Sequence, residues 1–308
     1  MTSYRRTWFI AGQGAIGSFC AANLERLDGN YQPISRSDGT AKRFVWGEQT
    51  VSLKAPVRLE HLSEIQNLLV PLKAYDVIPF LTRVIPHLAR RANVVLCHNG
   101  MGTLEAAADL LPQSCALYFC TTSNGAYKKG QDIVLAGQGE TYWNRIDTAQ
   151  PSSVHANPPP LTNSDFQALF GQAKRKAELN ELLWRKLLIN CVINPLTAIH
   201  NIKNGELIEE KFQPTICALM QEFLAVAATQ GWILRIDQAQ QVVRQVIIAT
   251  GANTSSMLQD VRASRQTEID YINGYVADLA QNLAISCPVN LALVNEVKNL
   301  CQQQPVDS

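Results

Sequence analysis

A polar stripe runs along an otherwise apolar helix that is predicted between residues 184 and 194. Lys186, Asn190 and Asn194 recur at four-residue spacing, which puts their side chains on one face of a helix. Apolar side chains occupy nearly all of the remaining faces of this helix, as in a helix buried inside a protein. Buried polar groups without partners cost roughly 1–3 kcal/mol each, and a charge costs more. A bound polar substrate would satisfy the stripe.

The alternative is a surface helix with a wide apolar face, whose lysine reaches into water. This stretch alone gives the two interpretations equal weight. A lysine in a dry cleft would suit proton transfer to an oxygen, since desolvation lowers the pKa of an ammonium group toward the working range.

A glycine-rich turn near the amino terminus spells GxGxxG with Gly12, Gln13, Gly14, Ala15, Ile16 and Gly17. The apolar run at residues 7–11 predicts a buried parallel strand before it, and residues 15–27 predict a helix after it. The first glycine permits a tight turn, the second admits a pyrophosphate, and the third lets the helix pack on the strand. The motif alone is weak, but its place between strand and helix favours a dinucleotide site over a chance turn.

Arg36, in the run Ile34-Ser35-Arg36-Ser37, bears on which nicotinamide cofactor is bound. NAD enzymes usually carry an acidic residue about 20 residues after the turn, bonded to the ribose hydroxyls. A guanidinium beside hydroxyl groups instead suits the 2′-phosphate of NADP, which it can bind in a bidentate fork. Asp38 keeps NAD open as a second choice, and Arg36 could also be a solvated loop arginine.

Two further polar residues follow predicted strands at residues 67–72 and 93–97, which flank a helical pattern at residues 77–88. Strands that alternate with helices indicate a parallel α/β sheet, and ligands of such sheets bind at the carboxyl ends of the strands. Lys73 and Asn99 stand at such ends. Each could equally be structural, Lys73 as a surface lysine and Asn99 as part of an Asn-Gly turn.

The chain is predicted to be almost wholly helical from about residue 164, after a proline-rich loop at residues 151–160. Three segments show helical periodicity, at residues 219–229, 238–249 and 257–283. An α/β half is therefore expected before a helical half.

Several polar residues of the helical half have ordinary structural interpretations. Ser256 and Gln259 fit a capping box at a helix start, which leaves N–H groups for an anion. Glu268 could form an exposed pair with Arg265, and Asn204 with Gly205 fits a helix-ending turn.

Size and composition fit a two-domain globular protein of a reducing compartment. The 308 residues are 46% apolar and 17% charged, and the net charge of +1 argues against a broad electrostatic grip on nucleic acid or membrane. The eight cysteines show no CxxC pair, and Cys97, Cys191 and Cys217 lie in apolar runs, as buried thiols do. No apolar run approaches the roughly 20 residues of a membrane span, so a cytoplasmic location without a membrane partner is expected.

From end to end the chain resembles the ketopantoate reductase (2-dehydropantoate 2-reductase) family. The matching segments are GQGAIG at 12–17, LKAY at 72–75, HNGMGT at 98–103, LWRKLLINCVINPLTAI at 183–199, NGEL at 204–207 and SSMLQDVRASRQTEIDYINGY at 255–275. The resemblance implies an α/β fold with an N-terminal Rossmann-type parallel-sheet domain and an all-helical C-terminal domain. We place these at residues 1–177 and 178–308, with the active site in the interdomain cleft.

The resemblance also assigns roles to single residues. Lys186 matches the catalytic lysine, and Glu268 matches the active-site glutamate at the junction of cofactor and substrate. The substrate-binding residues are matched by Lys186, Asn190, Asn194, Asn204 and Ser256, with Asn253, Thr254 and Ser255 in the same loop. The NADPH contacts are matched by Gly12, Gln13, Gly14, Ala15, Ile16, Gly17, Arg36, Lys73, Asn99, Ala126 and Glu268. The chain departs from the family locally, in ways that touch no residue assigned to chemistry, at Ser123-Asn124-Gly125, Trp143-Asn144 and Pro71.

The reaction implied by the resemblance is NADPH-dependent reduction of 2-dehydropantoate to (R)-pantoate, in pantothenate and coenzyme A biosynthesis. Lys186 is expected to stabilise charge on the carbonyl oxygen and to deliver the proton. Asn190 and Asn194 are expected to orient the substrate, and Ser256 to take its carboxylate. Glu268 could fix either the lysine or a substrate hydroxyl, and no metal is expected.

Two other functions stay open at this point. One is a reductase of another branched 2-oxo acid, because a fold does not fix its substrate. The other is a catalytically silent NADPH-binding sensor, against which the joint presence of Lys186, the asparagines and Glu268 speaks. Whether the protein is a monomer or a homodimer is equally open.

Overall fold

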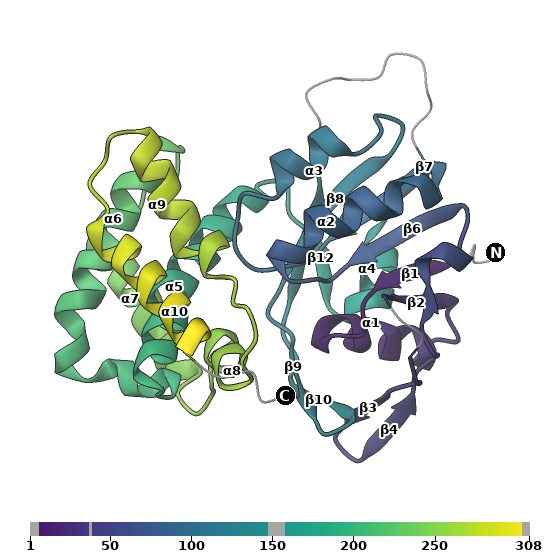
Figure 1. Cartoon of the computed structure of the whole chain (residues 1–308), viewed down its shortest axis with the longest axis horizontal. Helices are drawn as coiled ribbons and strands as arrows, with labels where there is room; N and C mark the ends of the chain where they lie inside the picture. The colour runs from purple at the N-terminus through teal and green to yellow at the C-terminus, as the bar shows by residue number, and fades with distance from the viewer. Residues whose placement is uncertain (1–5, 37–38, 147–157, 304–308) are drawn as a thin grey trace. The chain divides into compact units, whose positions relative to one another are not determined.

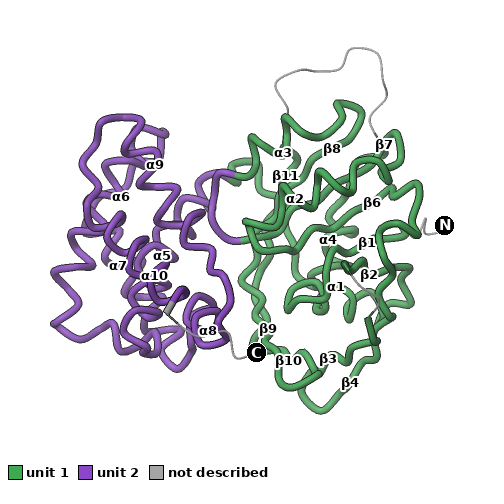
Figure 2. Tube along the Cα trace, in the orientation of Figure 1, with its two compact units in different colours: residues 1–98, 103–179 green, residues 99–102, 180–308 purple. Residues whose placement is uncertain are grey.

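The computed structural model describes residues 6–36, 39–146 and 158–303. The chain forms two compact units, drawn in different colours in Figure 2. Residues 1–98 and 103–179 make up the first, which we call the sheet unit, and residues 99–102 and 180–308 make up the second, the helical unit. The short segment 99–102 thus belongs to the helical unit by its contacts, although it directly follows a strand region of the sheet unit.

An eight-stranded sheet with the order β12-β11-β8-β7-β6-β1-β2-β5 forms the centre of the sheet unit (Figure 1). Its strands are β1 (Trp8–Ala11), β2 (Tyr31–Ser35), β5 (Val57–Arg58), β6 (Ile65–Val70), β7 (Leu88–Leu96), β8 (Ala116–Thr122), β11 (Thr141–Arg145) and β12 (Ala173–Arg175). The six strands from β5 to β8 in this order are parallel to one another, whereas β11 is antiparallel to β8 and parallel to β12. Their order is that of the doubly wound dinucleotide fold, in which the chain reverses direction across the sheet beside β1.

Helices cover the two faces of this sheet. They are α1 (Ala15–Arg26), α2 (Ala74–Val84), α3 (Leu104–Leu110) and α4 (Asn163–Phe170). Helices α1 and α4 pack against each other, as do α2 and α3, and Figure 1 shows the second pair in front of the sheet. The parallel α/β architecture predicted from the sequence is therefore confirmed. Within it, β6 ends before Pro71 rather than at residue 72, because proline has no N–H to continue the ladder.

Two features of the sheet unit differ from the sequence prediction. Helix α4 and strand β12 lie beyond residue 160 yet belong to this unit, so the helical half begins later than residue 164. A second sheet, with the order β4-β3-β10-β9, was not expected. Its strands are β3 (Arg43–Trp46), β4 (Gln49–Ser52), β9 (Gly125–Lys129) and β10 (Asp132–Gly137), and they pack against α1.

The helical unit is built around α5 (Leu179–His200), whose apolar residues form the centre of its core. The other helices are η3 (Asn204–Ile208), η4 (Glu210–Phe212), α6 (Gln213–Thr229), α7 (Ile236–Ala249), α8 (Ser256–Arg262), η5 (Ile269–Tyr271), α9 (Asn273–Asn282) and α10 (Pro288–Gln303). Length and composition would allow α5 to cross a membrane, but 67% of its most apolar window is buried inside the protein. Helix α5 is therefore a core helix of this unit.

Pro195 sits inside α5, where it cannot donate to the carbonyl of Cys191 four residues earlier. The side chain of Asn273 donates to that carbonyl instead, with 3.0 Å between Nδ2 and the oxygen. Asn273 is fully buried, and its amide also contacts Asn290 of α10. A substituted hydrogen bond thus lets the helix continue through proline for another turn.

The continuous helical pattern predicted for residues 257–283 is wrong. The chain breaks into α8, a loop, the short η5 and α9. The break follows Ser264, which has a left-handed φ of 50°, and the N–H of Arg265 donates to the carbonyl of Asp260 to close the end of α8. The apolar periodicity is real because every piece packs on the same core, but it does not show where the backbone turns.

Candidate active site

The glycine-rich turn joins β1 to α1 as predicted. Gly12 has a φ of 78°, which only glycine adopts without strain. A Cβ atom on Gly17 would lie 2.9 Å from the carbonyl oxygen of Gly12, so helix and turn can approach only because this residue is glycine. No atom lies within 4 Å of the corresponding position at Gly14. The turn therefore leaves open space beside the start of a twelve-residue helix, where free N–H groups can bind phosphate.

Polar side chains surround the second residue of this turn. The carbonyl of Gln13 accepts hydrogen bonds from the hydroxyl of Ser18, at 3.3 Å, and from the ammonium of Lys42, at 2.7 Å. The side-chain nitrogen of Gln13 is buried and has no partner within the described residues. The turn thus holds a donor that a ligand could satisfy. Sequence analysis missed Lys42, because the chain between residues 36 and 43 carries no motif.

Arg36 follows β2, and its guanidinium pairs with Asp76 in the first turn of α2. The arginine side chain is 71% exposed, so the pair contributes little to stability. Lys73 is the residue before α2, is half-buried, and is likewise at the carboxyl end of a strand, β6. The two cations predicted to meet the cofactor therefore flank the same helix start. Ser37 and Asp38, the second of which keeps NAD open, lie outside the described residues.

Ala126 lies in β9, opposite Leu135 of β10, and packs partly buried against the core of the sheet unit. It therefore belongs to the second sheet, not to an end of the large sheet. Its assignment as a cofactor contact stays a prediction.

The polar stripe of the central helix exists. Lys186 and Asn190 are half-buried, whereas Asn194 is 7% exposed. Their neighbours on α5 are core residues, so the alternative of a surface helix is wrong. The lysine and the two amides thus lie along one face of a helix that is otherwise packed into the protein.

Asn204 begins η3, so the prediction of a helix-ending turn here is wrong; α5 ends at His200, before Asn201 with its φ of 53°. The backbone N–H of Asn204 donates to the carbonyl of Asn253, at 3.1 Å, and its side-chain nitrogen donates to Thr250, at 3.0 Å. Two predicted substrate residues are thereby brought together. The side-chain oxygen of Asn204 is buried and lacks a partner within the described residues, so it can accept from a ligand.

The predicted capping box at Ser256 is wrong by one residue. Ser255 is the N-cap of α8, and its hydroxyl accepts from the N–H of Leu258 at 3.1 Å. The hydroxyl of Thr197, one turn beyond Asn194, also donates to Ser255 at 2.7 Å. Ser255 therefore ties α8 to α5, and Ser256 is left exposed as the first helical residue. The side chain of Gln259 donates to the carbonyl of Thr254, at 3.0 Å, instead of accepting from a backbone N–H at the helix start.

Glu268 is 4% exposed, so the predicted surface pair with Arg265 is wrong. Arg265 pairs with Asp260, at 3.0 Å. The carboxylate of Glu268 instead accepts a hydrogen bond from the side chain of Asn99, at 3.4 Å. A predicted cofactor residue and a predicted catalytic residue are therefore in contact, although 169 residues separate them in the chain.

Gly100 makes this contact possible. The N–H of Met101 donates to the carbonyl of Tyr271, at 2.8 Å, which fixes segment 99–102 beside η5. Gly100 has a φ of 78°, and a Cβ atom there would lie 2.4 Å from the same carbonyl oxygen. The Asn-Gly pair is thus more than a turn, because glycine is required for two backbones to approach.

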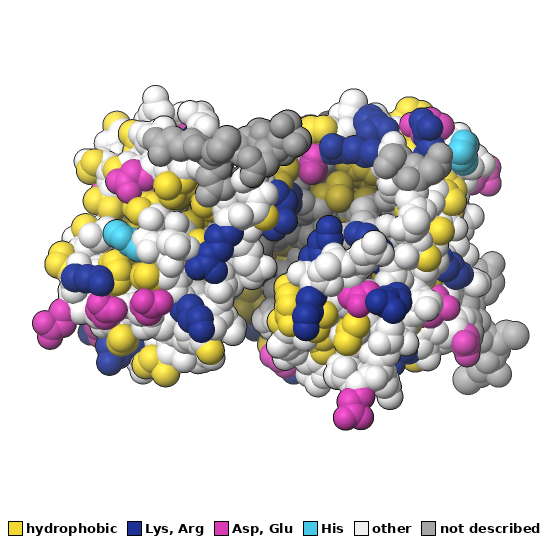
Figure 3. All heavy atoms as spheres, turned by 60° about the horizontal axis from the view of Figure 1, so that its bottom comes forward, with side chains coloured by type: hydrophobic (Ala, Val, Ile, Leu, Met, Phe, Trp, Pro, Cys, Tyr) yellow, Lys and Arg dark blue, Asp and Glu magenta, His cyan; other side chains and the backbone are white. Residues whose placement is uncertain are grey.

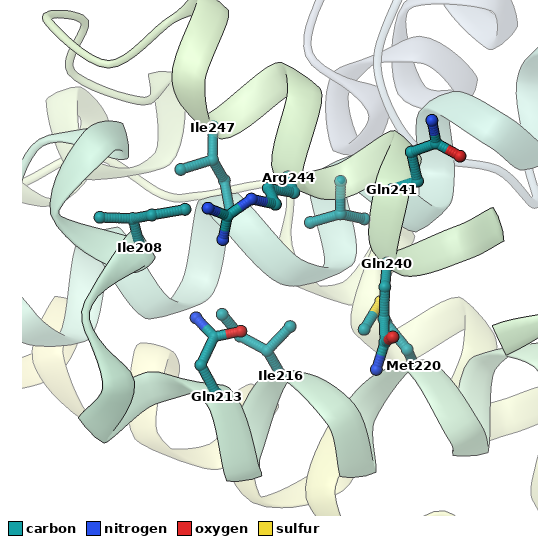
Figure 4. A pocket seen from close by; sticks show the side chains of 9 residues that line it. Ile208, Gln213, Ile216, Met220, Gln240, Gln241, Arg244 and Ile247 are labelled. Carbon is teal, nitrogen blue, oxygen red and sulfur yellow. The ribbon is translucent and has the colours of Figure 1, made fainter. Parts of the chain in front are cut away.

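A cavity of about 250 Å³ lies elsewhere in the helical unit, between η3, α6 and α7 (Figure 4). Gln213 and Arg244 point into it among isoleucine side chains, including Ile216 and Ile247. None of the predicted site residues lines this cavity.

The described residues include no group of three or more His, Cys, Asp or Glu that could hold a metal ion. The eight cysteines, all within the described residues, form no disulfide; Cys97 and Cys191 are buried as predicted, but Cys217 is only half-buried. Burial raises the pKa of Cys191 well above its ordinary value, so this thiol stays neutral.

Comparison with known proteins gives the family. Residues 8–148 match the family model described as "Ketopantoate reductase PanE/ApbA", and residues 178–301 match its C-terminal partner, "Ketopantoate reductase PanE/ApbA C terminal". The chain belongs to the ketopantoate reductase family. A 2-dehydropantoate 2-reductase of Vibrio cholerae is 35% identical over 301 residues, which cover 95% of this chain and 97% of the relative. That of Archaeoglobus fulgidus is 28% identical, over 94% of this chain and 96% of its own.

Solved structures share the fold of this ketopantoate reductase family member. A probable 2-dehydropantoate 2-reductase from Bacillus subtilis has a TM-score of 0.76 at 24% identity and covers 96% of this chain and 100% of its own. D-mandelate dehydrogenase in complex with NADH and anilino(oxo)acetate has a TM-score of 0.83 at 20% identity, covering 96% and 99%. These likenesses establish the Rossmann-type fold with its helical second part.

Asn124 and Trp143, at positions predicted to depart from the ketopantoate reductase family, make structural contacts within the sheet unit. The buried side chain of Asn124 donates to Thr122, at 2.9 Å, and accepts from the N–H of Gly139, at 2.8 Å. Trp143 stacks on Phe166, with 4.1 Å between ring centroids. Both side chains therefore contribute to the interior of the sheet unit.

Proposed function

We propose that this protein reduces 2-dehydropantoate to (R)-pantoate with NADPH as its cofactor. The observation that carries the proposal is the 35% identity to a 2-dehydropantoate 2-reductase over nearly the whole of both chains. Membership of the family makes the protein an NAD(P)-dependent oxidoreductase. We further propose a cytoplasmic location and a monomeric or homodimeric state. We place the boundary between the cofactor-binding domain and the catalytic domain near residue 177.

The residues at the glycine turn fit a dinucleotide. The positive φ of Gly12, the open space at Gly14 and a Gln13 side-chain nitrogen without a partner among the described residues are what a phosphate bound at a helix start requires. Gly12 to Gly17 would hold the pyrophosphate, with Lys73 and Asn99 at the carboxyl ends of neighbouring strands. When bound, the reduced nicotinamide supplies the hydride.

In this proposal Arg36 binds the 2′-phosphate and thereby makes the protein prefer NADPH to NADH. Replacing Arg36 by alanine is expected to weaken NADPH binding about tenfold to a hundredfold, since hydrogen bonds to charged groups contribute roughly 1.5–3 kcal/mol. NADH has no 2′-phosphate, so its affinity should stay nearly constant. Titration of both cofactors by fluorescence tests this, with the exposed Arg83→Ala as control. Equal losses for the two cofactors would refute the assignment.

Five residues of the helical unit would act on the substrate. Lys186 donates to the carbonyl oxygen, stabilises the charge that develops there, and delivers the proton. Asn190 and Asn194 orient the substrate from the same face of α5. Ser256 has an exposed hydroxyl and would hold the carboxylate. Glu268, which contacts Asn99, would place the carboxamide of that residue and accept from the substrate or from the lysine.

Asn204→Ala is expected to raise KM for 2-dehydropantoate about tenfold or more and to leave the affinity for NADPH unchanged. The side-chain oxygen of Asn204 has no partner among the described residues, so its loss would matter chiefly when a substrate hydroxyl is bound. Steady-state kinetics measure KM, and the exposed amide Asn282→Ala serves as control. A normal KM in the Asn204 variant would remove this residue from the substrate site.

The decisive test is a panel of 2-oxo acids assayed with NADPH and with NADH. The proposal predicts that 2-dehydropantoate with NADPH gives the highest kcat/KM. Faster reduction of another branched 2-oxo acid would identify that acid, instead of 2-dehydropantoate, as the preferred substrate. Cofactor binding without turnover of any acid would favour the silent sensor.

A further inference from the structure

Lys42 contacts the glycine-rich turn through its side chain, and its backbone is bound to the end of the small sheet. Its ammonium lies 2.7 Å from the carbonyl oxygen of Gln13, and its own carbonyl accepts from the N–H of Leu53, at 2.8 Å. The residue is half-buried just before β3. An ammonium has three N–H donors, and one bond to Gln13 leaves two of them for other acceptors.

A second cation lies near this lysine. In the small sheet, Lys128 of β9 is opposite Ile133 of β10, which is opposite Phe44 of β3. Side chains alternate along a strand, so Lys42, two residues before Phe44, lies on the same face as Lys128. The pKa of Lys42 is lowered, first by burial and then by the charge of Lys128. Two like charges thus approach each other close to the turn.

Nothing in the described part of the chain neutralises these two cations. The neighbouring Arg43 pairs with Asp132, at 2.8 Å, on the opposite face of the small sheet. No ion pair links Lys42 or Lys128 to a carboxylate among residues 6–36, 39–146 and 158–303. Figure 3 brings the lower edge of Figure 1 forward and shows Lys and Arg side chains spread over this face of the sheet unit, with Asp and Glu side chains among them.

We propose that Lys42 binds a phosphate group of the dinucleotide cofactor, with the charge of Lys128 strengthening the site. The inference rests on the proposed function and adds to it a cation that no motif marks. The unpartnered nitrogen of Gln13 supplies a further donor at the same turn. An arriving phosphate would relieve the repulsion between the two ammonium groups and satisfy the remaining donors, so the arrangement is better matched to a bound anion than to solvent.

The test is the affinity of the whole protein for NADPH and NADH, measured by calorimetry without substrate at several KCl concentrations. Lys42→Gln keeps a donor for the carbonyl of Gln13 but removes the charge. We expect it to weaken NADPH binding about tenfold and to make the affinity less sensitive to salt. Lys42→Arg should restore most of the affinity.

Lys129→Gln is the matched control. Lys129 is the next residue of β9 and is opposite Asp132, so its side chain lies on the other face of the small sheet. Lys129→Gln also removes one positive charge, from the strand that carries Lys128, and should leave both affinities unchanged.

The two cofactors show which phosphate is involved. A loss confined to NADPH assigns Lys42 to the 2′-phosphate, and an equal loss for NADH assigns it to the pyrophosphate; either supports the proposal. Normal affinity in Lys42→Gln overturns it, as does Lys42→Arg binding no better than Lys42→Gln. Because no substrate is present, these outcomes are separate from turnover. A wild-type protein that binds neither cofactor would defeat the proposed function as well.

Discussion

Replacing Lys186 by alanine is expected to lower kcat about a hundredfold or more while NADPH affinity stays near normal. Reduction of a ketone places negative charge on oxygen, and a positioned acid typically contributes a factor of about 10² to 10⁴ in rate. Lys186 projects, half-buried, from a core helix beside two carboxamides, which places it to act as that acid. Rapid-mixing measurements of NADPH consumption, with separate cofactor titrations, distinguish the chemical step from binding.

Arg185→Ala provides the control for this experiment. Arg185 is the adjacent cation on α5 but is exposed, so its removal should leave kcat unchanged. Added alkylamines should partly restore turnover to Lys186→Ala, since they can supply the missing proton and charge. Near-normal turnover in the Lys186 variant would show that another group protonates the product.

The large sheet could be predicted because its signals are local. A glycine turn between an apolar run and a helical pattern is read within 20 residues, and the strand order then follows from the doubly wound fold. The small sheet could not be predicted in this way. Strand β3 pairs in parallel with β10, about 90 positions later, and each strand has only four to six residues. Short strands that pair over such distances leave no periodic signal strong enough to distinguish them from loop.

The helical half shows what periodicity omits. The stripe of Lys186, Asn190 and Asn194 was visible because four-residue spacing fixes a helix face. The break between α8 and η5 could not be predicted, because Ser264 adopts a left-handed conformation that is not expected of a serine. The N-cap of α8 is Ser255 and not the predicted Ser256. The hydroxyl of Thr197 on α5 holds Ser255 in place, and that contact joins residues 58 positions apart.

The candidate site shows the same difference between local sequence signals and long-range contacts. Spacing and motif point to single residues such as Gly12 and Arg36. They do not show that Asn99 meets Glu268, that Asn204 meets the loop of Asn253, or that Lys42 meets the glycine turn. Those contacts depend on backbone approach between distant segments, which only the folded chain shows.

Gly100→Ala is expected to destabilise the protein by about 2 kcal/mol or more and to reduce kcat/KM severely. A left-handed φ costs a residue with a Cβ atom roughly 1–2 kcal/mol. In addition, that atom would lie 2.4 Å from the carbonyl oxygen of Tyr271, so segment 99–102 must move away from η5. The hydrogen bond from Met101 to Tyr271 and the contact between Asn99 and Glu268 would both be lost. Thermal unfolding measures the first effect, and steady-state kinetics measure the second.

Gly231→Ala separates the two causes. Gly231 has a φ of 79° in the same unit, but no atom lies within 4 Å of the position of its Cβ. This control should show the backbone cost alone, with normal kinetics. Because Gly100→Ala also displaces Asn99 from Glu268, its kinetic defect should resemble that of Asn99→Ala. If the Gly100 and Gly231 variants unfold at the same temperature and turn over at the same rate, then the close approach of segment 99–102 to η5 does not hold the site together.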